Sequence, residues 1–498
     1  MKSITTCAAF FSSLLLSAVA LADGGYYAGT LGAKAAGRGG AFTAKADDVT
    51  AISFNPAGLA KMDASLFQIG NEASYNTYSF TRTPTLDYRR TDPQTGAPTV
   101  VFDKVSNGTP WQMLLPMLGV TSRLGLENWG FGLAAFAPPG IGKMAFPPGG
   151  GQNYSQGGQR YMMLSREAII LTYAASAAWK YQDVFGLGAT AEWIHVPRLN
   201  YSLVVDGTGF PKAANPVSAP LDILATTKGS SAFTFNAILG AWYRPAPFLE
   251  FALSGQVVPA NIVTHSTLTV TPLDPSVVGS ITLTRRGMAA NDVKLTLPLP
   301  MIFRSGVRYR HLDGTREVFD VELDVDYATW SRVRNFTIDT NGLQANASGL
   351  DATPLDRIVI DKHWRDTVAF KLGGDYAVVP DQLTLRAGAY FETAVADPAY
   401  ANVDFPGGPQ LGGALGASLF FKQFEVVLAY QVRVQPSVSV SENDARVYQQ
   451  VPSSACVAPY TSTEYCNANF LNQPSPAVNA GTYSASSHLL AINVIYRH

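Results

Sequence analysis

Long stretches of this chain alternate between apolar and polar residues. The clearest stretch covers positions 319–327, where every odd position is apolar and every even position is acidic. The stretches 383–392 and 424–433 repeat the alternation with fewer charges. A period of two gives a β-strand one apolar and one polar face. Runs of about 10 such residues, repeated between turns, are typical of transmembrane β-barrels.

Alternation and turn signals together predict about 14 strands. They cover residues 66–80, 111–123, 128–137, 162–180, 183–204, 231–244, 247–269, 293–310, 316–338, 363–378, 381–394, 409–421, 423–441 and 482–497. The gaps alternate between short turns and long polar loops, and the long ones include 138–160, 205–230, 270–292, 339–361 and 442–481. Bacterial barrels place short turns in the periplasm and long loops outside. Because the first and last gaps are both long, the strand number is even and both termini are periplasmic.

The composition agrees with strands that face lipid. Only 15% of the residues are charged, against roughly 25% in soluble proteins. Aromatic residues such as Trp179, Tyr181, Trp193 and Tyr327 lie near strand ends, as in the aromatic girdles of membrane barrels. A soluble sandwich is the alternative, but its apolar face would need a compact core. The sequence therefore predicts an all-β fold, a transmembrane antiparallel β-barrel over residues 64–498.

The N-terminus predicts export. Lys2, an apolar stretch from Ala8 to Val19 and the small-residue site Ala20-Leu21-Ala22 predict a signal peptide over residues 1–22. The apolar stretch is shorter than the about 20 residues of a spanning helix. An exported chain without such a helix is a soluble periplasmic protein or an outer-membrane barrel. The second alternative fits the alternating strands.

Two cysteines remain after the predicted cleavage. Cys456 and Cys466 lie in a stretch rich in Pro, Ser and Asn. An oxidising compartment favours a disulfide between them, with free thiols as the alternative. Such a bridge would staple one loop.

Residues 23–63 show no alternation and precede the first strand. Gly and Ala dominate this segment, followed by a turn-rich stretch from Ser53 to Gly58. A short segment of small residues tied to a barrel of this size could fill the lumen as a plug. A disordered periplasmic tail is the alternative, but Val49, Ile52 and Phe54 argue against disorder.

The motifs in this segment resemble those of a known family. Gly37-Arg38-Gly39-Gly40, then Ala46-Asp47-Asp48, then Asn55-Pro56-Ala57 match the family pattern G-R-A-x-x-G, A-D-D and N-P-A at similar spacing. The chain thus resembles the FadL/TodX family of outer-membrane transporters for long-chain fatty acids and aromatic hydrocarbons. The resemblance implies a 14-stranded barrel plugged by an N-terminal hatch, with Gly37, Arg38, Asp47, Asp48, Asn55, Pro56 and Ala57 as hatch residues.

The resemblance also implies a lateral gate at a kink in the third strand. That strand, predicted over 128–137, runs directly into Pro138-Pro139-Gly140. Proline lacks the N–H that a ladder needs, so it interrupts pairing. The gate residues would be Phe136, Ala137, Pro138, Pro139 and Gly140. A simple strand end entering a loop is the alternative.

The family collects substrate between long external loops, which draws attention to the third long loop. Met144, Phe146, Met162 and Met163 form an apolar patch in or beside it. Exposed apolar patches usually mark interaction sites, so we expect these residues to capture substrate. Loop-on-loop packing is the alternative.

Charged residues are predicted to line the lumen. Arg304 and Arg308 face inward on one strand, opposite the acidic positions of the next strand, within cross-strand reach. They could hold a fatty-acid carboxylate, and His195 and Arg198 lie about where the family places a basic contact. The alternative is a salt-bridged wall. Any arginine without an acidic partner is then the better ligand candidate.

Other functions find little support. The six histidines have no metal-ligand spacing, and no nucleophile elbow or phosphate loop is present. We therefore expect a monomeric channel, not an enzyme, with no cofactor, no metal and no nucleic-acid partner. Its expected partners are a hydrophobic small molecule, outer-membrane lipid and lipopolysaccharide, and the barrel-assembly machinery. A general porin and a barrel-embedded lipase remain alternatives.

Overall fold

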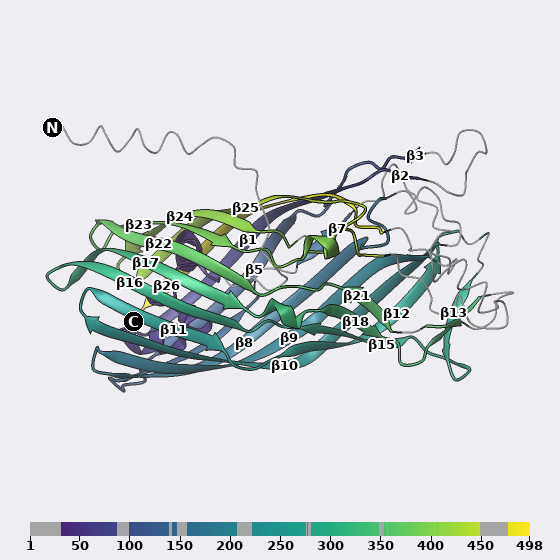
Figure 1. The fold of residues 1–498 in the computed structure, drawn as a ribbon. Helices are drawn as coiled ribbons and strands as arrows, with labels where there is room; N and C mark the ends of the chain where they lie inside the picture. The colour runs from purple at the N-terminus through teal and green to yellow at the C-terminus, as the bar shows by residue number, and fades with distance from the viewer. Residues whose placement is uncertain are drawn as a thin grey trace.

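The strands join edge to edge into one closed barrel, seen from the side in Figure 1. The computed structural model describes residues 31–86, 99–138, 142–146, 157–206, 222–274, 276, 280–347, 353–355, 357–405, 407–448 and 477–498. Within these ranges, no helix is long and apolar enough to cross a bilayer.

The barrel wall contains 20 strand segments. They are β1 (Leu66–Arg82), β4 (Val105–Ser106), β5 (Trp111–Ser122), β6 (Trp129–Phe136), β7 (Lys143–Ala145), β8 (Ser165–Tyr181), β9 (Phe185–Asp206), β10 (Asp222–Ala246), β11 (Leu249–Gln256), β12 (Asn261–Pro272), β15 (Asp292–Pro298), β16 (Ile302–Asp313), β17 (Arg316–Ala328), β18 (Asn335–Asp339), β21 (Ile358–Asp361), β22 (Thr367–Val379), β23 (Leu383–Glu392), β24 (Gln410–Phe421), β25 (Phe424–Val440) and β26 (Gly481–Arg497).

Smaller elements lie outside the wall ladder. They are α2 (Ala33–Gly37), α3 (Ala51–Phe54) and the 3-10 helices η1 (Pro56–Lys61), η5 (Trp330–Arg332) and η6 (Pro398–Tyr400), with β2 (Thr85–Leu86), β3 (Thr99–Val100), β13 (Ile281–Arg285), β14 (Met288–Ala289), β19 (Gln344–Ala347) and β20 (Thr353–Pro354). The strands β13, β14, β19 and β20 form a separate four-stranded sheet, and β2 pairs with β3.

The wall segments form 14 antiparallel strands around the barrel, which confirms the predicted fold class. Six of the 14 consist of two consecutive segments, such as β11 with β12. The last strand closes on the first through a ladder from Leu66↔Arg497 to Arg82↔Gly481. Closure leaves no free sheet edge.

Three strands that the sequence predicted as continuous are each divided into two segments in the structure. The prediction 247–269 is interrupted after Gln256 next to Pro259, and 293–310 is interrupted between Pro298 and Ile302. Proline cannot donate to a ladder, which explains both breaks. The prediction 316–338 is interrupted by η5, whose Trp330 turns inward and packs edge-on against Trp364 with 5.2 Å between ring centroids.

Two strand boundaries also differ from the predictions. The β10 strand begins at Asp222, so the end of the predicted loop 205–230 is strand. Its first residues are rich in Thr and Ser, and the alternation there is weak. The predicted strand 363–378 begins inside a break, because β21 ends at Asp361 and β22 starts at Thr367.

The alternation corresponds to the two faces of the wall. On β17, Val321 and Leu323 are exposed on the outside, whereas Glu322 and Asp324 are fully buried on the lumen side. Short turns join the strands at one end of the barrel and the long loops lie at the other (Figure 1). The C-terminal residue His498 exchanges two backbone hydrogen bonds with Ser65 at the short-turn end.

Candidate functional site

Residues 31–62, which we call the hatch, lie inside the barrel at its short-turn end (Figure 1). All of them are buried except Asp47, Ser53 and Lys61, which are half-buried. Hatch and wall share one apolar cluster, in which Val49 and Ile52 join Met117 and Phe136 of the wall. Residues 31–62 therefore pack against lumen-facing side chains of the wall, and residues 23–30 lie outside the described ranges.

Arg38 anchors the hatch to the wall. Its Nη1 donates to Asp320 Oδ1 at 2.6 Å and to Asp375 Oδ1 at 2.5 Å, and its Nη2 donates to Glu322 Oε2 at 2.9 Å. The guanidinium is fully buried. Burial alone lowers the pKa of Arg38, but the three carboxylates outweigh it and hold this pKa well above its usual value. Arg38 therefore stays positively charged and is surrounded by three carboxylates.

The acidic strip on β17 also binds the hatch backbone. Asp324 Oδ2 accepts hydrogen bonds from the amides of Phe42 and Thr43, both at 2.9 Å. Glu322 accepts from Ala44 N at 2.6 Å and from Lys45 N at 3.1 Å. Main-chain donors inside the lumen would otherwise lack partners. Two of the four alternating acids, Glu322 and Asp324, thus bind the hatch and not the neighbouring strand.

Glycines in the wall let the hatch backbone approach closely. An added Cβ would lie 2.4 Å from Ala57 N at Gly188, 2.1 Å from Asn55 Oδ1 at Gly240, 2.3 Å from Leu59 O at Gly130 and 2.1 Å from Arg38 O at Gly388. These distances are far below van der Waals contact, so any side chain there would displace the hatch.

The Asn55-Pro56-Ala57 motif ties the hatch together and to β10. Asn55 Nδ2 donates to Thr43 O at 3.0 Å and to Ala241 O of the wall at 3.1 Å. Its Oδ1 accepts from Ala57 N and so caps η1. Ala57 O in turn accepts from the indole of Trp242 at 3.0 Å. The motif therefore fixes the hatch to the wall through hydrogen bonds.

The remaining predicted hatch residues have local roles. Gly37 lies against Gly416 of β24, where an added Cβ would meet the Gly416 Cα at 3.0 Å. Asp47 lies 3.5 Å from Lys34 Nζ. Asp48 Oδ1 accepts from Thr50 N at 2.8 Å, while the buried Asp48 Oδ2 has no hydrogen-bond partner among the described residues.

The wall is interrupted beside the predicted gate. Pairing of β6 with β8 ends at Phe136↔Thr172, and pairing of β7 with β8 begins at Lys143↔Glu167. Among the described residues, Ile169, Ile170 and Leu171 of β8 have no ladder partner on this side. We call this break the wall interruption. Phe136 and Ala137 form its buried edge and Pro138 is half-buried, whereas Pro139 and Gly140 lie outside the described residues.

An apolar cavity of about 590 Å³ opens at the wall interruption. It is lined on the outer face by residues such as Leu114, Leu118 and Tyr173, and it reaches the lumen-facing Met117 and Phe136. Leu114 is 75% exposed, so the strand bordering the break offers apolar side chains to the outside. The cavity is therefore an apolar hollow on the outer face whose floor includes two lumen-facing side chains.

The upper lumen holds an apolar cluster instead of an exposed loop patch. Met144, Phe146, Met162 and Met163 are all buried in it. Tyr201 donates to Met162 O at 3.0 Å. These four residues therefore do not form the exposed capture patch expected from the sequence, and the alternative of internal packing describes them. Alternation cannot separate a loop that folds inward from one that stays in solvent.

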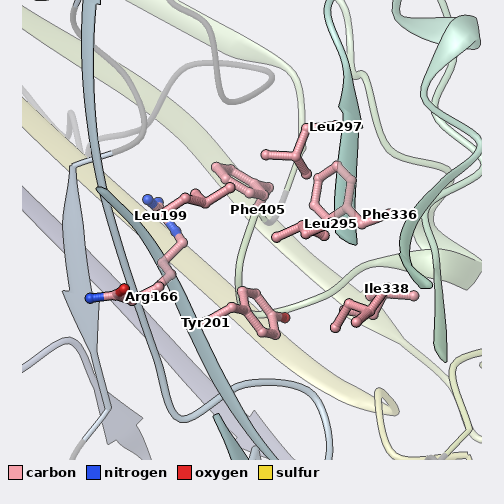
Figure 2. A pocket seen from close by; sticks show the side chains of 10 residues that line it. Arg166, Leu199, Tyr201, Leu295, Leu297, Phe336, Ile338 and Phe405 are labelled. Carbon is pink, nitrogen blue, oxygen red and sulfur yellow. The ribbon is translucent and has the colours of Figure 1, made fainter. Parts of the chain in front are cut away.

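A buried arginine lines a small cavity in this cluster. Figure 2 shows Arg166 with Leu199, Tyr201, Leu295, Leu297, Phe336, Ile338 and Phe405 around the space, which measures about 30 Å³. The guanidinium stacks over Phe405 at 4.4 Å. Its Nε has no hydrogen-bond partner, and within the described residues no carboxylate lies within 4 Å of it. The nearby Asp404 is bound by Lys362 Nζ at 2.6 Å.

The basic residues predicted from the sequence lie elsewhere. Arg304 contacts Asp326 at 3.6 Å, and Arg308 contacts Asp320 at 2.7 Å, so both are part of the salt-bridged wall. Arg198 is exposed on the outer face and pairs with Glu167 at 2.9 Å.

His195 lies on the same outer face as Arg198, beside Trp193, with 6.2 Å between ring centroids. His195 continues the outward alternation of Trp193, and a register shift between His195 and Arg198 turns Arg198 outward as well, so neither residue reaches the lumen. Arg166 was not among the basic residues predicted from the sequence.

Comparison with known proteins agrees with this geometry. The family model for outer membrane protein transport proteins (OMPP1/FadL/TodX) matches residues 13–470. The chain belongs to the FadL/TodX family. Its barrel has the fold of the family's outer-membrane transporters of hydrophobic compounds.

Solved structures of this family have the same fold. A FadL homologue of Pseudomonas aeruginosa has a TM-score of 0.69 at 16% identity, covering 95% of this chain and 99% of that chain. The toluene transporter TodX of Pseudomonas putida gives 0.61 at 14%, with 94% and 99% covered. The toluene transporter TbuX of Ralstonia pickettii gives 0.58 at 16%, with 94% and 98% covered. A comparison with curated protein sequences finds no match.

Family membership places the barrel in the outer membrane. The predicted signal peptide and the possible Cys456–Cys466 disulfide lie outside the described residues. In the described ranges, no group of three or more His, Cys, Asp or Glu could hold a metal ion.

Proposed function

We propose that this FadL/TodX family barrel takes up hydrophobic small molecules passively and releases them sideways into the outer membrane. The wall interruption beside Phe136 is the observation that carries this proposal, because an apolar cavity on the outer face lies next to it and has the lumen-facing Met117 and Phe136 in its lining. The hatch fills the lumen below that level, so an axial route to the periplasm is obstructed. Lateral exit also keeps an apolar solute out of water.

The favoured cargo is a long apolar molecule with a carboxylate, such as a long-chain fatty acid. Arg166 is buried without an acidic partner among the described residues, next to an apolar cavity. A buried charge is costly unless it is paired, so an anionic headgroup would relieve that cost. The cavity of about 30 Å³ is far smaller than the roughly 300–1,000 Å³ of a typical ligand pocket, so cargo must displace side chains such as Phe405. A neutral aromatic hydrocarbon would leave Arg166 unpaired.

The orientation follows the usual barrel rule. We place the short turns and both termini in the periplasm and the long loops outside. We also propose that the protein works as a monomer, is inserted by the barrel-assembly machinery and has lipopolysaccharide as its outer-leaflet neighbour. We propose no enzymatic activity. A general porin would need an open lumen, and the buried hatch speaks against it.

The experiment compares uptake and growth. Cells lacking the protein should grow poorly on oleate as sole carbon source, and the wild-type gene should restore growth. A variant with Pro138→Val and Pro139→Thr, which favours a continuous strand, should fold but lose uptake. Pro247→Val in the turn after β10 is the matched control and should behave as wild type. Normal uptake by the double variant would count against lateral release.

A further inference from the structure

Basic side chains gather on the outer face of the barrel wall, on four neighbouring strands. Lys228 on β10, His265 on β12 and Lys294 on β15 are exposed there, beside the exposed Arg198 on β9. We call these four residues the basic row. The next residues along each strand, such as Val293, are buried on the lumen side. Both β12 and β15 lie at the end of the barrel that carries the long loops (Figure 1).

The strand register places the basic row in one continuous band. His265 and Lys294 are direct ladder partners, so their Cβ atoms lie about 4.5–5.5 Å apart. Lys228 pairs with Thr267, two residues from His265, and diagonal neighbours of this kind lie about 7–8 Å apart. Arg198 stands in the same diagonal relation to Lys228 on the other side. Like charges at such spacing destabilise a sheet unless an opposite charge compensates them.

The acidic residues on this face have other contacts. They are Glu167, paired with Arg198 at 2.9 Å, Asp292, paired with Arg285 at 2.7 Å, and Asp339, whose Oδ1 accepts from Asn341 N at 3.0 Å. Among the described residues, no carboxylate lies within 4 Å of the ammonium group of Lys228 or Lys294. Within that part of the chain, the two lysines are therefore cations without an acidic partner.

The apolar band of the outer wall ends just below the basic row. Trp193 on β9, Phe233 on β10 and Val263 on β12 are all exposed on the outer face. Each lies closer to the short-turn end than the basic residue of its strand. Aromatic residues mark the boundary between hydrocarbon and headgroups in membrane barrels. The basic row therefore lies at the level of the lipid headgroups.

The other side of the barrel carries neutral groups near its long-loop end. On β25 and β26, hydroxyl pairs face outward beyond the apolar band, with Ser437 and Ser484 at 3.0 Å and Ser439 and Thr482 at 3.2 Å. These groups satisfy one another and carry no charge. Positive charge at the headgroup level is thus a property of one side of the wall and not of its whole rim.

We propose that the basic row binds the phosphate groups of a phosphorylated glycolipid in the outer leaflet. Lysine ammonium groups bind phosphate as point charges, and clusters of basic residues at a membrane surface attract anionic headgroups. A phosphate above His265 would contact Lys228 and Lys294, while the acyl chains of the same lipid would lie against Phe233 and Val263. This inference rests on the proposed orientation, in which the long loops lie outside.

The test measures lipid binding to the purified full-length barrel by native mass spectrometry. The probe is lipid A with two phosphates, titrated in detergent. The test variant combines Lys228→Gln with Lys294→Gln. Its control combines Arg316→Gln with Lys422→Gln, which removes the same charge from exposed positions at the short-turn end. Heat-dependent mobility on gels checks that both variants are folded.

We expect the test variant to bind lipid A about 30-fold more weakly, since each lysine near an anionic membrane surface contributes roughly fivefold. The control variant should bind as wild type does. Lipid A without phosphates should bind the wild-type barrel as weakly as the phosphorylated lipid binds the test variant. High salt should weaken only the binding of the phosphorylated lipid, because salt screens exposed charges.

Three results would overturn the proposal. Equal binding of lipid A with and without phosphates would show that acyl chains alone hold the lipid. Inorganic phosphate binding as tightly as the phosphorylated lipid would make the row a site for free anions. Oleate binding that depends on the same two lysines would assign the row to the cargo.

The proposed transport is tested separately from this lipid site. Oleate uptake is measured in cells, and the test variant should take up oleate at the wild-type rate. If the wild-type barrel binds lipid A but does not raise oleate uptake, the proposed function fails and the lipid site stands. If uptake is normal but removal of the two lysines leaves lipid binding unchanged, the lipid site fails alone.

Discussion

Arg38 Nη1 and Asp320 Oδ1 lie 2.6 Å apart, which joins the hatch to the middle of β17 inside the barrel. Both side chains are fully buried. Removing one partner of a buried ion pair leaves an unpaired charge and costs about 3–5 kcal/mol. We therefore expect Arg38→Ala to release the hatch, because Asp320, Glu322 and Asp375 would repel one another around an empty site. Planar-bilayer recordings should then show ion conductance that the wild-type barrel lacks.

Arg198→Ala is the control for this prediction. Its partner Glu167 lies on the outer face, and an exposed pair contributes about 0–1 kcal/mol. This variant should neither conduct nor lose stability. If Arg38→Ala conducts no more than Arg198→Ala, the hatch is held mainly by its apolar contacts and backbone hydrogen bonds.

The wall glycines that contact the hatch lead to a second prediction. Gly188→Ala places a Cβ 2.4 Å from Ala57 N, a backbone atom that cannot rotate away. Overpacking of this kind costs about 1–3 kcal/mol, so the hatch should loosen while the outer wall stays intact. Faster proteolysis of residues 31–62 would report this loosening of the hatch. Gly413→Ala on β24 is the control, since its nearest neighbour is a Val432 methyl at 3.9 Å. Equal proteolysis of both variants would contradict the prediction.

The sequence was informative where a local period determines structure. Alternation around 319–327 identified β17 and its inward acids, and the alternating gap lengths determined the even strand count. Breaks at Pro259 and Pro300 were missed because the alternation continues through them. Proline marks a possible break, but it does not say whether a bulge or a new segment follows.

The site was harder to predict because its contacts join distant parts of the chain. The acids of β17 were predicted to face arginines on the preceding strand, yet Glu322 and Asp324 bind hatch amides. Nothing local distinguishes an acid that faces a neighbouring strand from one that faces a plug. Arg198 falls on an inward position when the alternation is counted through β9, and the register shift between His195 and Arg198 places it on the outer face.

A buried aspartate makes the hatch sensitive to pH. Burial raises the pKa of Asp48; Lys34 opposes this effect and Asp47 adds to it. A raised pKa means that the ionised form is disfavoured in the folded state, so the seated hatch gains stability as pH falls through the folded pKa. Asp48→Asn keeps the acceptor for Thr50 N and removes the buried charge. It should raise the melting temperature at neutral pH, with a difference from wild type that shrinks on acidification. A lower melting temperature at neutral pH would contradict this.

Arg166 allows the cargo to be identified. Replacement by methionine keeps a long apolar side chain in the cavity but removes the charge, so a fatty-acid carboxylate loses its partner. Hydrogen bonds to charged groups contribute about 1.5–3 kcal/mol, which corresponds to roughly 10- to 100-fold weaker binding. The oleate concentration that gives half of the maximal uptake rate should rise by this factor. Toluene uptake should be unchanged or improved. Arg198→Met, on the outer face, should affect neither. Equal loss of oleate and toluene uptake would show that Arg166 serves the packing of the lumen and not the recognition of a carboxylate.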